Sequence, residues 1–206
     1  MLRKPYSSAC DRNRDPILNV LRVHFADRAR VLEIGSGTGQ HAVYFAQALP
    51  HLIWQATDCA ENLHGIRLWL EEADLPSTPP PLELDVTADQ WPPQNFDAVF
   101  SANTLHIMSW AEVERMFSGL SEVMTDDAKL SIYGPFNYGG NFTSESNAAF
   151  DASLKAQAPH MGIRDFEAVD TLAQSIGLKL VEDVAMPANN RCLVWQRSSD
   201  SARRSD

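Results

Sequence analysis

The chain has 206 residues, a length that favours one large domain over two small ones. Apolar residues make up 44% and charged residues 21%, which supports a hydrophobic core and argues against a largely disordered chain. The net charge of −10 argues against general binding to nucleic acids, and no apolar run is long enough for a membrane span.

The three cysteines, Cys10, Cys59 and Cys192, stand far apart and form no CxxC pair. A disulfide framework and a zinc ribbon are therefore disfavoured, and the first residues lack the apolar segment of a secretory signal. We expect a cytoplasmic protein. Residues 1–30 carry seven Lys or Arg against three Asp or Glu. This basic end is either a binding region for an anionic ligand group or a solvated helix.

Strand-like runs and helical patterns alternate along the chain. A first helix is expected behind Asp15-Pro16, and a last one over 166–176 with Asp165 as its N-cap. Apolar spacing predicts further helices within 40–49, 63–70 and 113–123. Short apolar runs predict strands over 31–34, 52–57, 82–86, 96–101, 129–133, 178–185 and 192–197.

This alternation predicts an α/β fold, with a doubly wound, seven-stranded, mostly parallel sheet. The last two strands are joined by a turn too short for a crossover, so they predict a C-terminal antiparallel hairpin. We expect a single domain over 1–197 with an N-terminal cap segment (1–29), an insertion that forms a lid (137–165) and a disordered tail (198–206). Ligands of such sheets bind at the carboxyl ends of the strands.

A glycine-rich turn, Glu33-Ile-Gly35-Ser36-Gly37-Thr-Gly39, follows the first predicted strand. Glycines allow a tight turn and a close approach of a ligand, and the next helix offers free N–H groups. The G-x-G-x-G spacing differs from the G-x-G-x-x-G of dinucleotide-binding proteins. Asp58 and Asp85 stand at the ends of the next two predicted strands, where they suit a ribose diol and an adenine amino group. Either alone could be a turn cap.

The segments VLEIGSGTG, TD (57–58), LDV (84–86) and FDAVFSANTLH (96–106) resemble the class I S-adenosylmethionine-dependent methyltransferases. More narrowly, the chain resembles an uncharacterised methyltransferase-like family. The shared segments are RNRDPIL (12–18), GTGQHAVYFA (37–46), SANTLHI (101–107), YGPF (133–136), TSESNAAFDASL (143–154), GIRD (162–165) and MPANN (186–190). This resemblance implies the fold and S-adenosyl-L-methionine as cofactor, and it names no substrate.

The resemblance also implies a set of cofactor-binding residues. Glu33 would fix the glycine turn and meet the ammonium group, and Asp58 would hold the ribose. The other implied contacts are Gly35, Ser36, Gly37 and Gly39 to the methionine and ribose, Asp85 and Val86 to the adenine, and Ala102 and Asn103 around the sulfonium. Arg14 or Arg12 would pair with the cofactor carboxylate. His41 is expected to be a helix residue rather than a ligand.

Methyl transfer needs an acceptor held in line with the sulfonium, and a base helps when the acceptor arrives protonated. His106 is the candidate base, with Asn103 beside it; a loop histidine bonded to a carbonyl and a turn-forming asparagine are the alternatives. SANTLHI stands where amino-methylating enzymes have (N/D)PP(Y/F), which weakens a nucleic-acid or protein amide acceptor. No carboxylate cluster follows this strand, so we expect no metal.

The acceptor pocket is expected around Gly134-Pro135, with aromatic walls from Tyr133, Phe136 and Tyr138. Core packing explains Tyr133 equally well. Arg164 would bind an anionic group of the acceptor, with a surface salt bridge as the alternative.

The sequence favours a small-molecule methyltransferase, with no nucleic-acid or membrane partner. A non-catalytic S-adenosylmethionine-binding protein and an NAD-type oxidoreductase are the competing hypotheses. The oligomeric state is open, with a homodimer among the alternatives.

Overall fold

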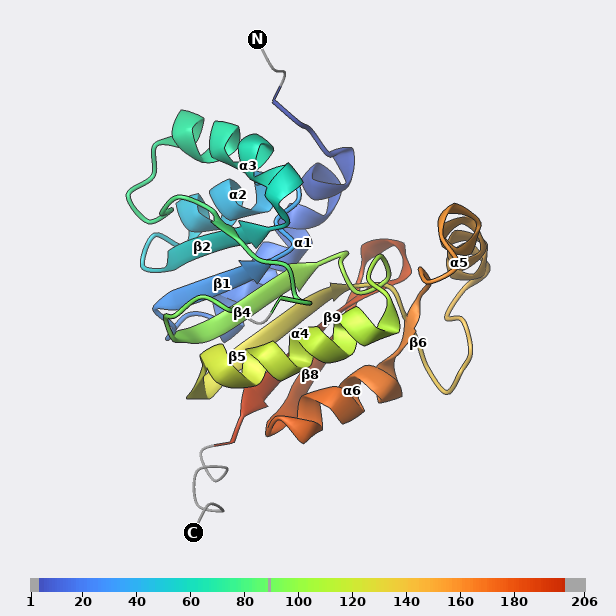
Figure 1. The fold of residues 1–206 in the computed structure, drawn as a ribbon. Helices are drawn as coiled ribbons and strands as arrows, with labels where there is room; N and C mark the ends of the chain where they lie inside the picture. Colours follow the sequence, from blue (N-terminus) through green and yellow to red (C-terminus); the bar gives the residue numbers. More distant parts are fainter. Residues whose placement is uncertain (1–3, 89, 199–206) are drawn as a thin grey trace.

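The computed structural model describes residues 4–88 and 90–198, and a seven-stranded sheet runs through its centre (Figure 1). Its strands are β1 (Arg30–Ile34), β2 (Ile53–Asp58), β3 (Leu82–Glu83), β4 (Phe96–Ala102), β5 (Met124–Gly134), β8 (Leu178–Met186) and β9 (Asn190–Arg197). They lie in the order β3-β2-β1-β4-β5-β9-β8, and only the pairs that involve β9 are antiparallel. The predicted doubly wound sheet with a C-terminal hairpin is confirmed.

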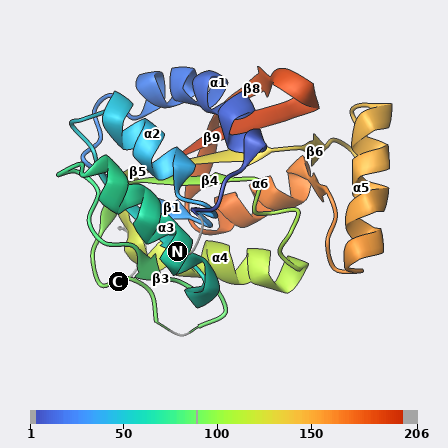
Figure 2. The same ribbon diagram turned by 90° about the horizontal axis from the view of Figure 1, so that it is seen from above.

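Six helices are described: α1 (Ser8–His24), α2 (Gln40–Ala48), α3 (Ala60–Ala73), α4 (Trp110–Val123), α5 (Glu145–Gln157) and α6 (Phe166–Ser175). The first three cover one face of the sheet, and α4 and α6 cover the other (Figures 1 and 2). Helix α5 stands off to one side, next to a small second sheet of β6 (Phe136–Asn137) and β7 (Arg164–Asp165). A short 3₁₀ helix, η1 (Pro187–Asn189), joins β8 to β9. Of the helices in the described ranges, none combines the length and apolar character that a membrane span requires.

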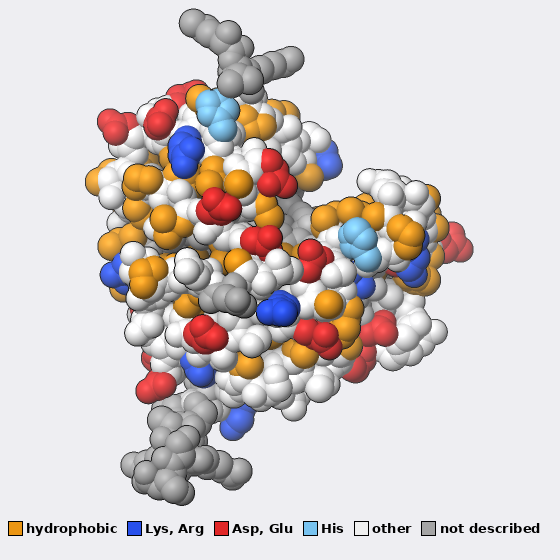
Figure 3. All heavy atoms as spheres, in the orientation of Figure 1, with side chains coloured by type: hydrophobic (Ala, Val, Ile, Leu, Met, Phe, Trp, Pro, Cys, Tyr) orange, Lys and Arg blue, Asp and Glu red, His pale blue; other side chains and the backbone are white. Residues whose placement is uncertain are grey.

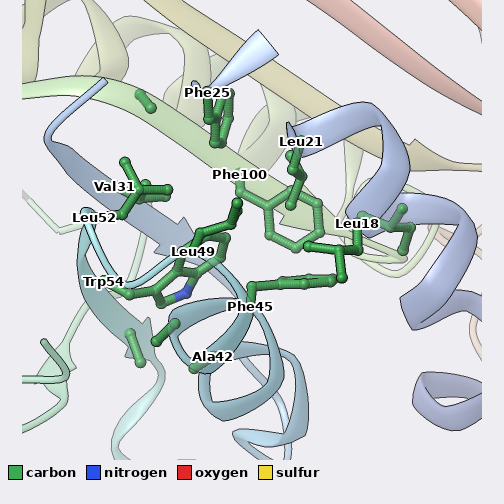
Figure 4. Close-up of a cluster of buried hydrophobic side chains, with 14 of the residues drawn as sticks. Leu18, Leu21, Phe25, Val31, Ala42, Phe45, Leu49, Leu52, Trp54 and Phe100 are labelled. Atoms are coloured by element: carbon green, nitrogen blue, oxygen red, sulfur yellow. The ribbon is translucent and has the colours of Figure 1, made fainter. Parts of the chain in front are cut away.

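The core forms one cluster on each face of the sheet. Adjacent residues of β1 enter opposite clusters, Val31 toward α1–α3 and Leu32 toward α4 and α6, because successive strand side chains point to opposite faces. The first cluster is built around Phe45, Trp54 and Phe100, whose ring centroids lie 5.3–5.8 Å apart (Figure 4). Burial on both faces explains why the central strands read as continuous apolar runs.

The first helix was predicted to begin at Asp15-Pro16, and that start is wrong. Helix α1 begins at Ser8, and Pro16 lies inside it. Tertiary contacts stabilise the additional turns, because Asn13 Oδ1 lies 2.7 Å from Nε2 of His41 on α2. Asp165 does occupy the N-cap position of α6, without a side-chain capping bond.

The end of one predicted strand also differs from the structure. The strand predicted to run to Val86 ends at Glu83. The Leu84 N–H still bonds the Asp58 carbonyl at 2.9 Å, and the chain then turns at Asp85. Of the predicted tail, the structure describes Ser198, whose N–H bonds the carbonyl of Gly177 at 3.0 Å. Residues 199–206 lie outside the described part of the chain.

Candidate active site

A cavity of about 1360 Å³ opens at the carboxyl ends of β1, β2 and β4, where the strand order reverses. Its wall includes the glycine turn after β1, the loop after β4, the start of the described chain and α5. Figure 3 shows the surface hollowed between the part that carries α2 and α3 and the projecting α5, with acidic side chains beside the hollow. The cavity therefore joins the predicted glycine site to the predicted insertion.

The glycine turn presents main chain to this cavity. Gly35 and Gly37 have φ angles of +71° and +58°, which side chains disfavour. A Cβ on Gly37 would meet nothing within 4 Å, so its backbone is open to a ligand. A Cβ on Gly35 would lie 2.2 Å from Thr104 Cγ2. Glycine at this position therefore allows the loop after β4 to pack closely against the turn. Ser36 also lines the cavity.

Asp58 lies at the end of β2 and lines the same cavity. Its Oδ2 accepts from the Gly37 N–H at 2.6 Å, and its Oδ1 accepts from Cys59 N–H and Asn62 Nδ2, both at 2.8 Å. A carboxylate has about four lone-pair sites, so this one still has capacity to accept hydrogen bonds from a diol. The backbone bonds fix its orientation before any ligand arrives.

Three members of the predicted cofactor set, Glu33, Gly39 and Arg14, are not among the residues that line the cavity. The first two lie behind the glycine turn. Glu33 is buried, and its Oε2 accepts from Trp54 Nε1 and Ser36 Oγ, both at 2.9 Å. Burial raises its pKa to about 7. Gly39 is the N-cap of α2, where a Cβ would lie 3.1 Å from Ile66 Cα. Both residues support the turn.

Asp85 and Val86 line the cavity on the side of α3, together with Leu84. The Oδ1 of Asp85 accepts from the N–H and the hydroxyl of Thr87, at 2.8 and 2.7 Å. These bonds hold the pKa of Asp85 below its usual range. Asp85 therefore caps this turn, as the sequence left open, and it also lines the cavity.

The loop after β4 brings Ala102, Asn103 and His106 to the cavity. Asn103 has a left-handed backbone (φ 60°), and its N–H bonds the Tyr133 carbonyl at 2.8 Å. His106 is buried, and burial together with the charge of Arg164 lowers its pKa to about 4. Its ring contacts Phe150 edge-on, with centroids 5.3 Å apart. The imidazole is therefore neutral near pH 7.

The structure places Arg12, rather than Arg14, in the cavity wall. Arg14 Nη1 bonds Asp11 at 3.0 Å, and its guanidinium lies 4.6 Å from the centroid of the Tyr44 ring. Arg12 Nη1 donates to Ser8 Oγ, also at 3.0 Å. Within the described residues, Arg12 is the one Lys or Arg that lines the cavity.

The four residues predicted to bind the acceptor do not line the cavity; of that region, Pro135 does. Tyr133 and Phe136 are buried in the two core clusters, one on each side of the sheet. Tyr138 stacks on Phe166, and its hydroxyl donates to Asp183 at 2.8 Å. Arg164 donates to main-chain carbonyls. Tyr133, Phe136 and Tyr138 therefore act in packing, whereas Arg164 acts through hydrogen bonds to the main chain.

The sequence analysis did not identify several of the lining residues, which come from the N-terminal segment and from the 137–165 insertion. From the N-terminal segment come Pro5, Ser7 and Cys10, and from the insertion come Phe150, His160 and Met161. His41 also lines the cavity, and burial lowers its pKa to about 4. The apolar residues of the 143–154 segment are the sequence feature that could have indicated its contribution to the cavity. Within the described ranges, no group of three or more His, Cys, Asp or Glu side chains is placed to hold a metal ion.

The comparison with protein families gives a clear match. The model of a family described as "Protein of unknown function (DUF938)" matches residues 4–197. The chain belongs to this family. The family's description assigns no activity.

Solved structures with the same fold include several described as methyltransferases. An O-methyltransferase family protein from Burkholderia thailandensis matches with a TM-score of 0.80 and 17% identity, over 90% of this chain and 56% of that one. The S-adenosylmethionine-dependent methyltransferase SibL, in its apo form, matches with 0.78 and 21%, over 92% and 56%. PigF with SAH matches with 0.75 and 14%, over 88% and 55%. This chain thus spans little more than half the length of these proteins, and the likeness shows a shared fold.

Proposed function

We propose that this protein transfers a methyl group from S-adenosyl-L-methionine to a small-molecule acceptor. One observation carries the proposal: the open glycine turn, Asp58 and Asp85 line one side of a single cavity that continues to Asn103 and His106. The fold shared with methyltransferases, one of them solved with SAH, supports it. The residues present fit the cofactor, because Gly37 leaves open space and Asp58, which lines the same cavity, keeps lone pairs free for a diol.

Each part of the cavity has a role in this proposal. The turn from Gly35 to Gly37 holds the methionine and ribose region, Asp58 accepts from the ribose hydroxyls, and Asp85 with Val86 bounds the adenine. Of the two arginines considered for the cofactor carboxylate, Arg12 takes this role, because it lines the cavity and has no carboxylate partner in the described chain. Glu33 and Gly39 support the turn from behind.

The acceptor side of the cavity suits a small, partly apolar molecule. Its wall includes Ile107, Met108, Pro135, Phe150 and Met161, and it also holds Glu112, Asn147 and His160. The cofactor supplies a methyl group on a sulfonium that is already activated, so the protein's main work is to hold the acceptor in line and exclude water. Neutral His106 can take a proton from an acceptor hydroxyl, and Asn103 flanks the transfer site.

Calorimetry with S-adenosylmethionine, S-adenosylhomocysteine and NAD tests the cofactor. Binding of the first two without NAD is expected, and preference for NAD would favour an oxidoreductase. Incubation of metabolite extracts with methyl-labelled cofactor then tests transfer. Label in a small molecule supports the enzyme, whereas tight binding without transfer to any extract would favour a non-catalytic binding protein.

A further inference from the structure

Arg164 holds together two segments that wall the acceptor side of the cavity. Its Nε donates to the carbonyl of Leu105 at 3.0 Å, and its Nη2 donates to the carbonyls of His160, also at 3.0 Å, and Met108. The side chain is half-buried and has no salt bridge within the described residues. All its hydrogen bonds thus go to main chain on both sides of His106 and in the segment after α5.

The two residues before Arg164 complete this connection. The Gly162 N–H bonds the carbonyl of His106 at 3.0 Å. The Ile163 N–H bonds Oδ1 of Asp151, a buried residue of α5, at 2.8 Å. A Cβ on Gly162 would lie 2.9 Å from the same Oδ1, so the approach is close. Residues 162–164 therefore tie α5 to the loop that carries His106.

The His106 ring has no hydrogen-bond partner among the described residues, although histidines with catalytic roles are usually oriented by one. Arg164 is the charged group that acts on the His106 pKa, and Asp151 on α5 and Glu112 on α4 act in turn on Arg164. Glu112 and His160 line the same cavity, and Lys155 pairs with Asp151. The ring is positioned by its main chain and by Phe150 of α5. Both of these are fixed by the contacts of residues 162–164.

We propose that Arg164 is a positioning residue for methyl transfer: it fixes the 105–108 loop against the segment after α5 and so sets where His106 meets the acceptor. This inference rests on the proposed function. It replaces the expectation that Arg164 binds the acceptor directly. Lysine cannot reproduce the role, because one ammonium lacks the planar fork that reaches three carbonyls.

The test uses NMR of ¹³C,¹⁵N-histidine-labelled full-length protein, with Arg164→Gln and Arg164→Lys. Arg197→Gln is the matched control, since Arg197 Nη1 also donates to two carbonyls, of Ser121 (3.2 Å) and Met124 (2.6 Å), away from the cavity. In both Arg164 variants we expect a changed His106 ring signal and loss of its contacts to Phe150. In Arg164→Gln the His106 pKa should also rise, by roughly half a pH unit or more, because a nearby positive charge is removed.

Calorimetry with S-adenosylhomocysteine separates the two proposals. Arg164 does not line the cavity, so its variants should bind this probe within about twofold of wild type. An unaltered His106 signal and pKa in folded Arg164→Gln would overturn the positioning role, as would the same His106 change in Arg197→Gln. Failure of wild type to bind the probe would instead count against the proposed function. If Arg164→Gln does not fold, Arg164→Lys carries the test through the ring signal and the Phe150 contacts.

Discussion

The main-chain N–H of Gly37 donates to Oδ2 of Asp58 over 2.6 Å, and this bond joins the glycine turn to the end of the neighbouring strand. Glycine at position 37 leaves the backbone free to make the bond at φ +58°. The turn and the carboxylate are thus held in a fixed relation before a ligand enters. Such preorganisation lowers the ordering cost of binding.

Asp58→Ala should weaken binding of S-adenosylhomocysteine by roughly 1–3 kcal/mol, or about 5- to 150-fold, because ribose hydroxyls lose their acceptor. Asp97→Ala is the control: Asp97 also accepts from two backbone N–H groups, of Ala29 and Arg30, but outside the cavity wall. It should lower stability without changing affinity. Calorimetry at one salt concentration checks both. Unchanged affinity in Asp58→Ala would contradict the ribose assignment.

His106→Gln should leave cofactor affinity intact and lower turnover of an identified acceptor by about 10²- to 10⁴-fold. Because the pKa of His106 is lowered to about 4, the wild-type rate contributed by this base should be level between pH 6 and 8 and should fall toward pH 4. Rate profiles of wild type and variant check this, with His51→Gln, outside the cavity wall, as control. Equal turnover at every pH would exclude His106 as the base.

Glu33→Gln should change how stability depends on pH. The folded-state pKa of Glu33 is about 7 against an ordinary 4.5, so its stabilising contribution is complete below pH 4.5 and is lost as the pH rises through 7. Relative to the variant, wild type should lose at most about 3 kcal/mol between pH 4.5 and 8. Urea unfolding at pH 5 and pH 8 measures this, with exposed Glu83→Gln as control. A constant difference would contradict the raised pKa.

Gly65→Ala tests whether the N-terminal segment closes over the cofactor. Its Cβ would lie 2.6 Å from Pro5 Cγ, while Trp69 Nε1 donates to the Pro5 carbonyl at 2.8 Å. Helix propensity alone would make the variant more stable by about 0.5–1 kcal/mol, but displacement of Pro5 should offset this gain. We expect faster dissociation of S-adenosylhomocysteine in stopped-flow measurements, because Pro5 and Gly65 both line the cavity.

Gly119→Ala provides the matched control for this substitution. Its Cβ would also collide with a side chain, at 1.8 Å from Trp91 Cε2, but on α4 and outside the lining of the cavity. It should lower stability and leave the dissociation rate unchanged. Equal rates in Gly65→Ala and wild type would show that the segment does not restrain the ligand.

The sequence by itself determined the order of strands and helices, the terminal hairpin and the glycine turn with Asp58. These features are encoded locally, by apolar runs, by glycines that allow positive φ, and by polar residues at strand ends. It could not locate the start of α1, because the contact of Asn13 with His41 is long-range. The sequence also did not show which side chains line the cavity.

Tertiary structure decided how the polar and aromatic residues divide between cavity and support. Arg12 and Arg14 are two residues apart, yet helical rotation places one in the cavity wall and pairs the other with Asp11. The sequence predicted that Arg164 binds an anionic group, whereas in the folded chain it donates to the carbonyls of Leu105 and Met108. A hydrogen bond between segments far apart in sequence depends on how they pack, so only the folded chain specifies it.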